Sequence, residues 1–273
     1  MSKKYRIGFI GAGNMGSAMI GGVISRGVCD KSRVIASSVN PDDLNRVSGA
    51  YGISTTSNNS ELAAESEIVI LAVKPYQLDD VLADIRDAID EETIVVSIAA
   101  GRNISSIESA LMSVKVVGKL RVFRAMPNTP ALVGEGMTGI APGTNVKEDD
   151  YDIVLEVFNS FGKAQIISEE DIEIITGLSG SSPAYVYMMI EAMADAAVEQ
   201  GFARDKAYLF ASQAVLGSAK MVRDTGRHPG ELKDAVTSPG GTTIAGVRAL
   251  EEGAFRATVA DAVRAAVERC REM

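Results

Sequence analysis

The sequence predicts an α/β fold: a doubly wound, mostly parallel sheet over residues 1–167, followed by an all-helical domain over residues 168–273. Three observations predict it. A glycine-rich turn joins the first apolar strand to a helix near the start of the chain. Apolar runs of strand length then alternate with helical segments up to about Ser168, as in βαβ units. Beyond that residue the strand signals stop, and apolar residues recur only at helical spacing.

The glycine-rich turn has the pattern Gly11-x-Gly13-x-x-Gly16. It follows the apolar strand Ile7–Ile10 and opens a helical pattern of small residues over Asn14–Arg26. This order is the context that a dinucleotide-binding fingerprint requires. The first glycine permits the tight turn, the second lets the backbone approach a pyrophosphate, and the third lets the helix pack against the strand. The phosphates would lie at the helix N-terminus; the alternative is a purely structural turn.

The remaining segments of the first domain alternate in the same way. Continuous runs rich in Ile and Val are typical of parallel strands that are covered on both faces. We expect further strands at Arg33–Ser37, Glu67–Val73, Thr93–Ile98, Val122–Met126, Met137–Ala141 and Ala164–Ile167, and helices at Ser60–Ala64, Gln77–Ile89 and Ile104–Leu111.

The second domain is expected to contain the helices Pro183–Gln200, Lys206–Thr225 and Phe255–Arg271. These segments carry many alanines and have apolar positions on more than one face, so they must be buried. In a domain this small, a subunit interface would bury them, and we expect a homo-oligomer. The alternative is a compact helical core without a partner.

The composition limits the class of protein. Hydrophobic residues make up 46% of the 273 residues, which is enough for a full core. The net charge of −9 argues against nucleic acid or an anionic membrane as the main partner. The apolar stretch after Lys3 and Lys4 is too short for a signal peptide, and no run approaches the length of a membrane span. We therefore expect a cytoplasmic protein.

Few residues of this chain suit acid–base or metal chemistry. The two cysteines, Cys29 and Cys270, lie near opposite ends without metal or redox spacing, so we expect no disulfide and no metal site. The single histidine, His228, precedes Pro229, which is typical of the first residue of a helix. A structural or solvated histidine is favoured over a catalytic base. The chemistry is expected to belong to the cofactor.

The loop after the second expected strand bears on the choice of nucleotide. An NAD site usually has an acidic residue there to hold the ribose 2′-hydroxyl, but no acid occurs before Asp42. Ser37, Ser38 and Asn40 could instead donate hydrogen bonds to a 2′-phosphate, which favours NADP. No arginine lies in that loop to clamp the phosphate. The alternative is a set of ordinary turn formers with loose cofactor choice.

Three further segments have the character of site loops. Residues 71–75 end a buried strand at a proline, and Lys74 is either a proton donor or a residue whose backbone faces the cofactor. Residues 124–130 contain two prolines that would stiffen a loop at the nicotinamide pocket; the alternative is a rigid turn. Residues 237–244, Thr-Ser-Pro-Gly-Gly-Thr-Thr-Ile, form either an anion-binding nest for a substrate carboxylate or a well-capped helix start.

Taken together, these motifs resemble the pyrroline-5-carboxylate reductase family over essentially the full length. The resemblance depends on residues 8–16, 72–75, 97–101, 124–130, 177–185 and, above all, 237–244. One departure is Ser182, where the family usually has glycine. The resemblance implies an N-terminal Rossmann domain and a helical dimerisation domain, with dimers often assembled into a decamer. It also implies NADPH-dependent reduction of 1-pyrroline-5-carboxylate to L-proline, with NADH as a possible second cofactor.

The resemblance also implies roles for individual residues. Ser238, Gly241 and Thr242 would hold the substrate carboxylate, and the Thr243 hydroxyl would bond the ring nitrogen. The site would lie in the cleft between the domains. The cofactor-binding residues would be Gly11, Gly13, Asn14, Met15 and Gly16 at the pyrophosphate, Ser37, Ser38 and Asn59 at the adenine ribose, and Ala72, Val73, Lys74, Pro75, Ala99 and Gly101 at the nicotinamide half.

Three other functions remain as alternatives. A β-hydroxyacid dehydrogenase also joins such a domain to helices, but it uses a lysine early in the helical domain, and residues 177–189 contain none. A regulatory protein could bind NADP without turnover, although the loop at residues 237–244 would then be superfluous. A deazaflavin-dependent oxidoreductase can begin with a similar fingerprint, but its helical domain is expected to be shorter.

Overall fold

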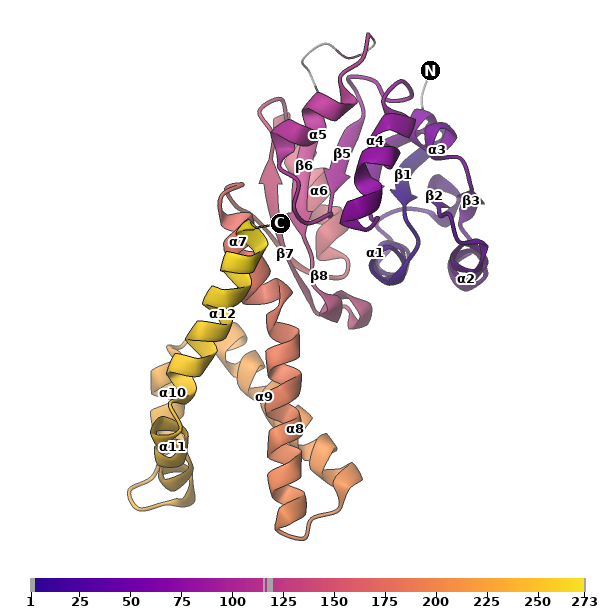
Figure 1. The fold of residues 1–273 in the computed structure, drawn as a ribbon. Helices are drawn as coiled ribbons and strands as arrows, with labels where there is room; N and C mark the ends of the chain where they lie inside the picture. Colours follow the sequence, from indigo (N-terminus) through magenta and orange to yellow (C-terminus); the bar gives the residue numbers. More distant parts are fainter. Residues whose placement is uncertain (1–2, 115, 117–119, 273) are drawn as a thin grey trace. The chain divides into compact units, whose positions relative to one another are not determined.

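The structure, a computed structural model, describes residues 3–114, 116 and 120–272 (Figure 1). Its contacts group the chain into two compact units. The first contains residues 1–180 together with residues 266–273, and the second contains residues 181–265. The expected domain boundary between residues 167 and 168 stays a prediction.

The first unit is built on one eight-stranded sheet with the order β3-β2-β1-β4-β5-β6-β7-β8. All neighbouring strands are parallel except β6 and β7. The order reverses between β1 and β4, as in a doubly wound dinucleotide-binding sheet, which confirms the predicted fold class. The strands are β1 (Tyr5–Ile10), β2 (Val34–Ser37), β3 (Ser54–Thr56), β4 (Ser66–Leu71), β5 (Ile94–Ser97), β6 (Arg121–Met126), β7 (Gly136–Pro142) and β8 (Gly162–Ile166).

Helices cover both faces of this sheet and form two separate apolar cores. One core joins α1 (Asn14–Ser25), α2 (Pro41–Tyr51) and α6 (Glu148–Asn159) to side chains such as Phe9 and Phe123. The other core joins side chains such as Val95 and Leu71 to the remaining helices. Those helices are α3 (Asn59–Glu65), α4 (Leu78–Ile85), α5 (Ile104–Leu111) and α7 (Asp171–Ile175).

Besides the short helix α7, three elements of this unit are absent from the expected set, and each has a weak sequence signal. The strand β3 has three residues, none of them buried. The helix α2 is mostly polar, and Val47 is its one buried residue. The helix α6 begins with three acidic residues, which suit a helix N-terminus but interrupt the apolar pattern by which the helix could be predicted. These elements form because neighbouring strands and helices hold them, which a local pattern does not reveal.

The second unit consists of helices: α8 (Ser182–Glu199), α9 (Arg204–Thr225), α10 (Pro229–Ala235), α11 (Thr242–Glu252) and most of α12 (Phe255–Arg271). Its buried side chains are small. Among residues 181–265, all described, the buried ones are Ala194, Ala207 and Ala211, whereas Met188 is 70% exposed. The expected all-helical character is confirmed, but this unit buries little of its apolar surface within one chain.

His228 has the structural role that the sequence favours. It is exposed and precedes α10, whose first residue is Pro229. Its Nδ1 accepts a hydrogen bond of 3.0 Å from the backbone N–H of Gly230. Cys29 and Cys270 are both free. Within the described part of the chain, no helix is long and apolar enough to cross a membrane.

Candidate active site

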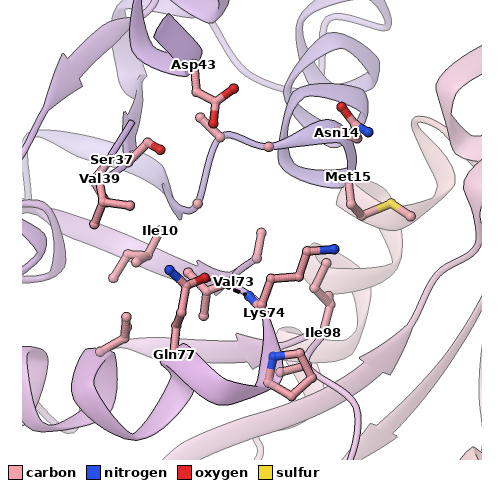
Figure 2. A pocket seen from close by; sticks show the side chains of 18 of the residues that line it. Ile10, Asn14, Met15, Ser37, Val39, Asp43, Val73, Lys74, Gln77 and Ile98 are labelled. Carbon is pink, nitrogen blue, oxygen red and sulfur yellow. Dashed lines mark hydrogen bonds between the residues drawn. The ribbon is translucent and has the colours of Figure 1, made fainter. Parts of the chain in front are cut away.

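A cavity of about 720 Å³ lies at the carboxyl ends of five strands of the first unit (Figure 2). Its lining residues follow β1, β2, β4, β5 and β6, the edge where open α/β sheets bind ligands. Ser37, Val39 and Asp43 lie toward one end of the cavity, and Met15 and Lys74 lie toward the other (Figure 2). The strand order therefore gathers loops that are far apart in sequence around one hollow.

The three glycines of the first turn have different surroundings. Gly11 has a φ of +106°, and an added Cβ would lie 2.4 Å from the carbonyl oxygen of Ala72. A Cβ on Gly16 would lie 2.1 Å from the carbonyl oxygen of Gly11, so Gly16 permits close packing of α1. A Cβ on Gly13 would meet nothing within 4 Å. Gly13 thus borders open space, which a Cβ at this position would enter without meeting other atoms.

The N-terminus of α1 is open to an anion. Its N-cap residue, Gly13, provides no side chain that accepts from the first N–H groups. Asn14 and Met15, the first residues of the helix, line the cavity. Free N–H groups at the positive end of a helix bind phosphate oxygens well. The glycine turn therefore fits the pyrophosphate of a dinucleotide.

At the ribose end, two serines differ in what they can donate. Ser37 is fully buried, and its hydroxyl donates to Oδ1 of Asn59 over 2.7 Å. Asn59 in turn donates to Asp84. Ser38 is partly exposed, and its Oγ accepts from the backbone N–H of Asn40 over 3.1 Å, which leaves the hydroxyl hydrogen available. The Ser38 hydroxyl is therefore free to donate, whereas the Ser37 hydroxyl is committed to Asn59.

The opposite end of the cavity is mainly apolar. Ala72, Val73 and Pro75 line it after β4, and Ala99 lines it after β5. Lys74 also lines the cavity, and its backbone N–H donates to Oε1 of Gln77 over 3.3 Å (Figure 2). Such a surface suits a flat ring such as nicotinamide, with few polar groups to hold water.

Asn128 holds the proline-rich loop after β6 in place. Its Oδ1 accepts from the backbone N–H of Met137 over 2.8 Å, and its Nδ2 donates to the carbonyl oxygen of Ser179 over 2.9 Å. Met126, Pro127 and Thr129 of the same segment line the cavity. The loop that the sequence singled out therefore contributes to the cavity wall, and Asn128 is a positioning residue rather than a lining one.

The structure brings together nearly all the residues expected to bind the cofactor. All of them line the cavity except Gly16, which packs behind the turn, and Gly101. Asp43 also lines the cavity, and Arg46 donates to the carbonyl oxygen of Ala12 in the glycine turn. Sequence reasoning singled out neither residue, because it looked for charged residues in the loop and not on the helix after it. Their placement depends on α2, whose mostly polar sequence has little apolar periodicity to reveal a helix.

The loop at residues 237–244 lies in the second unit. Gly240 has a φ of +66°, and the N–H of Gly241 donates to the carbonyl oxygen of Ser238 over 3.1 Å. The helix α11 then begins at Thr242, and its N-cap, Gly241, provides no side-chain acceptor. No side chain therefore caps this helix start. The first N–H groups of α11 and the exposed hydroxyls of Thr242 and Thr243 are open to an anion.

Known proteins resemble this chain over its whole length. Residues 169–273 match the family model for pyrroline-5-carboxylate reductase dimerisation, and residues 6–101 match that for coenzyme F420-dependent NADP oxidoreductases. The pyrroline-5-carboxylate reductase of Escherichia coli is 46% identical, over 100% of this chain and 99% of the relative. That of Arabidopsis thaliana is 42% identical, over 100% and 96%. The chain belongs to the pyrroline-5-carboxylate reductase family.

Solved structures of the pyrroline-5-carboxylate reductase family have the same fold. The enzyme from Coxiella burnetii superposes with a TM-score of 0.90 at 35% identity, covering 100% of this chain and 98% of that one. The pyrroline carboxylate reductase from Plasmodium falciparum, solved with NADP bound, gives a TM-score of 0.86 at 34% identity, covering 100% and 99%. The F420-type match is confined to the first domain, so it describes the nucleotide-binding half that these proteins share.

Proposed function

We propose that this chain reduces 1-pyrroline-5-carboxylate to L-proline with NADPH, the last step of proline biosynthesis. The observation that carries the proposal is the similarity to reductases of that name over the full length of both chains. The cavity at the glycine turn and the open N-terminus of α11 add two anion-binding features, as expected for a phosphate-bearing cofactor and a carboxylate substrate.

The first unit provides the groups that would hold the dinucleotide. The N–H groups at the start of α1 would bind the pyrophosphate, and Ser38 would donate to the 2′-phosphate. The apolar wall after β4 and β5 would hold the nicotinamide ring. When bound, NADPH supplies the hydride that adds to the C=N carbon. We expect NADH to serve as a weaker alternative.

The second unit provides the groups that would hold the substrate. We assign the carboxylate to the loop formed by Ser238, Gly241 and Thr242, at the start of α11, where no side chain caps the first N–H groups. We assign the ring nitrogen to the hydroxyl of Thr243, next along α11. These residues would orient one face of the ring for reaction, and orientation alone lowers a barrier substantially.

The reaction needs little acid–base chemistry from the protein. A cyclic imine is basic, and its protonated form already accepts a hydride; the proton on nitrogen and the added hydride together give the amine of proline. His228 is committed to capping α10 and is exposed. Lys74 lies at the cavity edge. We assign it to cofactor contact through its backbone rather than to proton transfer.

We further propose that the functional form is a homo-oligomer assembled through the helical unit, with a decamer of five dimers as the expected state. The match of residues 169–273 to a dimerisation family model supports the assembly. The apolar side chains that this unit leaves exposed in one chain support it as well. We expect the protein to act in the cytoplasm.

The direct test mixes purified protein with racemic 1-pyrroline-5-carboxylate and either NADPH or NADH. The nicotinamide absorbance and the proline formed are followed together. We expect NADPH oxidation with one proline produced per cofactor, and slower oxidation of NADH. Binding of NADPH without oxidation would overturn the proposal and favour a regulatory protein. Oxidation of a 3-hydroxy acid by NADP⁺, in the absence of imine reduction, would favour the dehydrogenase alternative.

A further inference from the structure

Asp43 places a carboxylate in the wall of the cofactor cavity, at the end lined by Ser37, Ser38 and Asn40. Its side chain is only 22% exposed. This is the end where the adenine ribose of a dinucleotide is expected. A carboxylate there accepts hydrogen bonds from a ribose 2′-hydroxyl and repels a 2′-phosphate. By itself, Asp43 would select NAD over NADP.

Arg46 counters this charge from the next turn of α2. Its Nη2 lies 2.7 Å from Oδ1 of Asp43, and the same nitrogen donates to the carbonyl oxygen of Ala12 over 2.6 Å. An exposed ion pair three residues apart on a helix contributes little to stability. The added bond to the backbone of the glycine turn fixes this guanidinium in place, so its charge stays beside the carboxylate.

The bond to Ala12 also fixes the glycine turn. In a trans peptide the C=O and the following N–H point in opposite directions. With the carbonyl of Ala12 held by Arg46, the N–H of Gly13 points away from the arginine. Arg46 therefore ties together the two features that a dinucleotide phosphate meets, the acidic residue at the ribose and the turn at the pyrophosphate.

We propose that Arg46 is a specificity-determining residue that permits NADP to bind by neutralising Asp43. The inference rests on the proposed use of NADPH. With Arg46 in place, Ser38 and Asn40 offer donors to a 2′-phosphate beside a neutral pair. Without it, the uncompensated carboxylate repels that phosphate and accepts the 2′-hydroxyl of NAD instead. The choice between NADP and NAD thus depends on whether the positive charge of Arg46 offsets the negative charge of Asp43.

The test measures binding of NADP⁺ and NAD⁺ by calorimetry, since these probes differ only in the 2′-phosphate and no turnover is needed. Arg46→Met is expected to weaken NADP⁺ binding by about tenfold or more while NAD⁺ changes less than about twofold. Asp43→Asn alone is expected to tighten NADP⁺, and the double variant Asp43→Asn/Arg46→Met should recover most of the lost affinity. Asp42→Asn, on the same turn but outside the cavity wall, is the matched control and should change neither affinity.

Two results would overturn the inference. Equal losses for both nucleotides in Arg46→Met would show that Arg46 only supports the glycine turn. Failure of the double variant to recover NADP⁺ affinity would show that Arg46 does not act through Asp43. The single variant Asp43→Asn gives an independent answer if Arg46→Met does not fold, because an unchanged NADP⁺ to NAD⁺ ratio there also contradicts the inference. If NADP⁺ behaves as expected but no imine is reduced, the proposed function fails while this inference stands.

Discussion

The two units of this chain bury their apolar residues in different ways. The sheet of the first unit has a continuous core on each face, with large side chains such as Phe9, Phe123 and Phe158 fully buried. The second unit buries three alanines and leaves Leu209 and Phe210 each 65% exposed. The first unit is complete within one chain. The second unit leaves large apolar side chains exposed, as is typical of a surface that binds another protein. Its match to a dimerisation family indicates that the partner is a second copy of the chain.

The two units also differ in the groups that they offer for binding an anion. The first holds its cofactor cavity with polar side chains fixed by neighbouring elements, as Asn59 and Asn128 show. The second offers exposed N–H groups and threonine hydroxyls at the start of α11. The cofactor cavity is thus built within the first unit of one chain, whereas the loop proposed to bind the substrate belongs to the unit that matches the dimerisation family.

The largest effect is expected from a charge on the exposed apolar surface of the second unit. Leu209→Arg should raise the dissociation constant of the oligomer by at least about tenfold, because the guanidinium would be desolvated in the interface. The mass in solution, measured by light scattering, checks this. The matched control is Val114→Arg in the first unit, where Val114 is 94% exposed. An unchanged mass in Leu209→Arg would contradict the comparison, as would an equal effect of both changes.

The second prediction separates two glycines of the same turn. Gly13→Ala should leave the melting temperature nearly unchanged, because its Cβ meets nothing within 4 Å, yet weaken NADP⁺ binding by about tenfold or more. Gly16→Ala should destabilise the fold by about 1–3 kcal/mol, since its Cβ would overlap the carbonyl oxygen of Gly11. Thermal melting and calorimetry on both variants test this. Loss of stability in Gly13→Ala with normal NADP⁺ binding would reverse the assigned roles.

The smallest effect concerns a half-buried carboxyl of the first unit. Burial, and then the nearby charge of Glu169, raise the pKa of Glu108 above its usual value. Its Oε1 is buried without a hydrogen-bond partner among the described residues. Because the folded pKa is raised, ionisation costs stability, and that loss grows as pH rises from the unfolded pKa through the folded one.

Glu108→Gln removes that loss and should raise the melting temperature by about 1–3 °C at pH 7.5, with a smaller gain near pH 4. Glu92→Gln is the control of opposite sign. Lys147, followed by Arg121, lowers the pKa of Glu92, so its charge favours the fold above the unfolded pKa. A pH-independent gain in Glu108→Gln would show that the group is not titrating as described.

Much of the first unit follows from local pattern. The apolar runs of β1, β4 and β5 are long and buried on both faces, so the sequence alone predicts them and the parallel sheet. The strand β3 and the polar helix α2 could not be predicted, because neighbouring elements and not their own periodicity hold them. Helices α8, α9 and α12 were foreseen within a few residues of their ends.

The candidate site was predictable at positions where the backbone conformation or a close contact permits only one residue type. Gly11 and Gly16 are examples, since a positive φ and a close backbone contact both demand glycine. The commitment of the Ser37 hydroxyl to Asn59 and the pairing of Asp43 with Arg46 depend on which side chains the fold brings together. Residue types along one loop do not contain that information. The sequence identifies donors and charges, and the fold decides which of them are already used.

In the proposed function, the first unit binds the cofactor and the start of α11 binds the substrate. Thr243→Ala separates these two roles, with NADP⁺ affinity from calorimetry set beside kcat/KM for imine reduction. We predict an unchanged dissociation constant for NADP⁺ and a fall in kcat/KM of about tenfold or more, from a lost hydrogen bond worth about 1–3 kcal/mol. Unchanged kcat/KM, or an equal loss of NADP⁺ affinity, would contradict the claim.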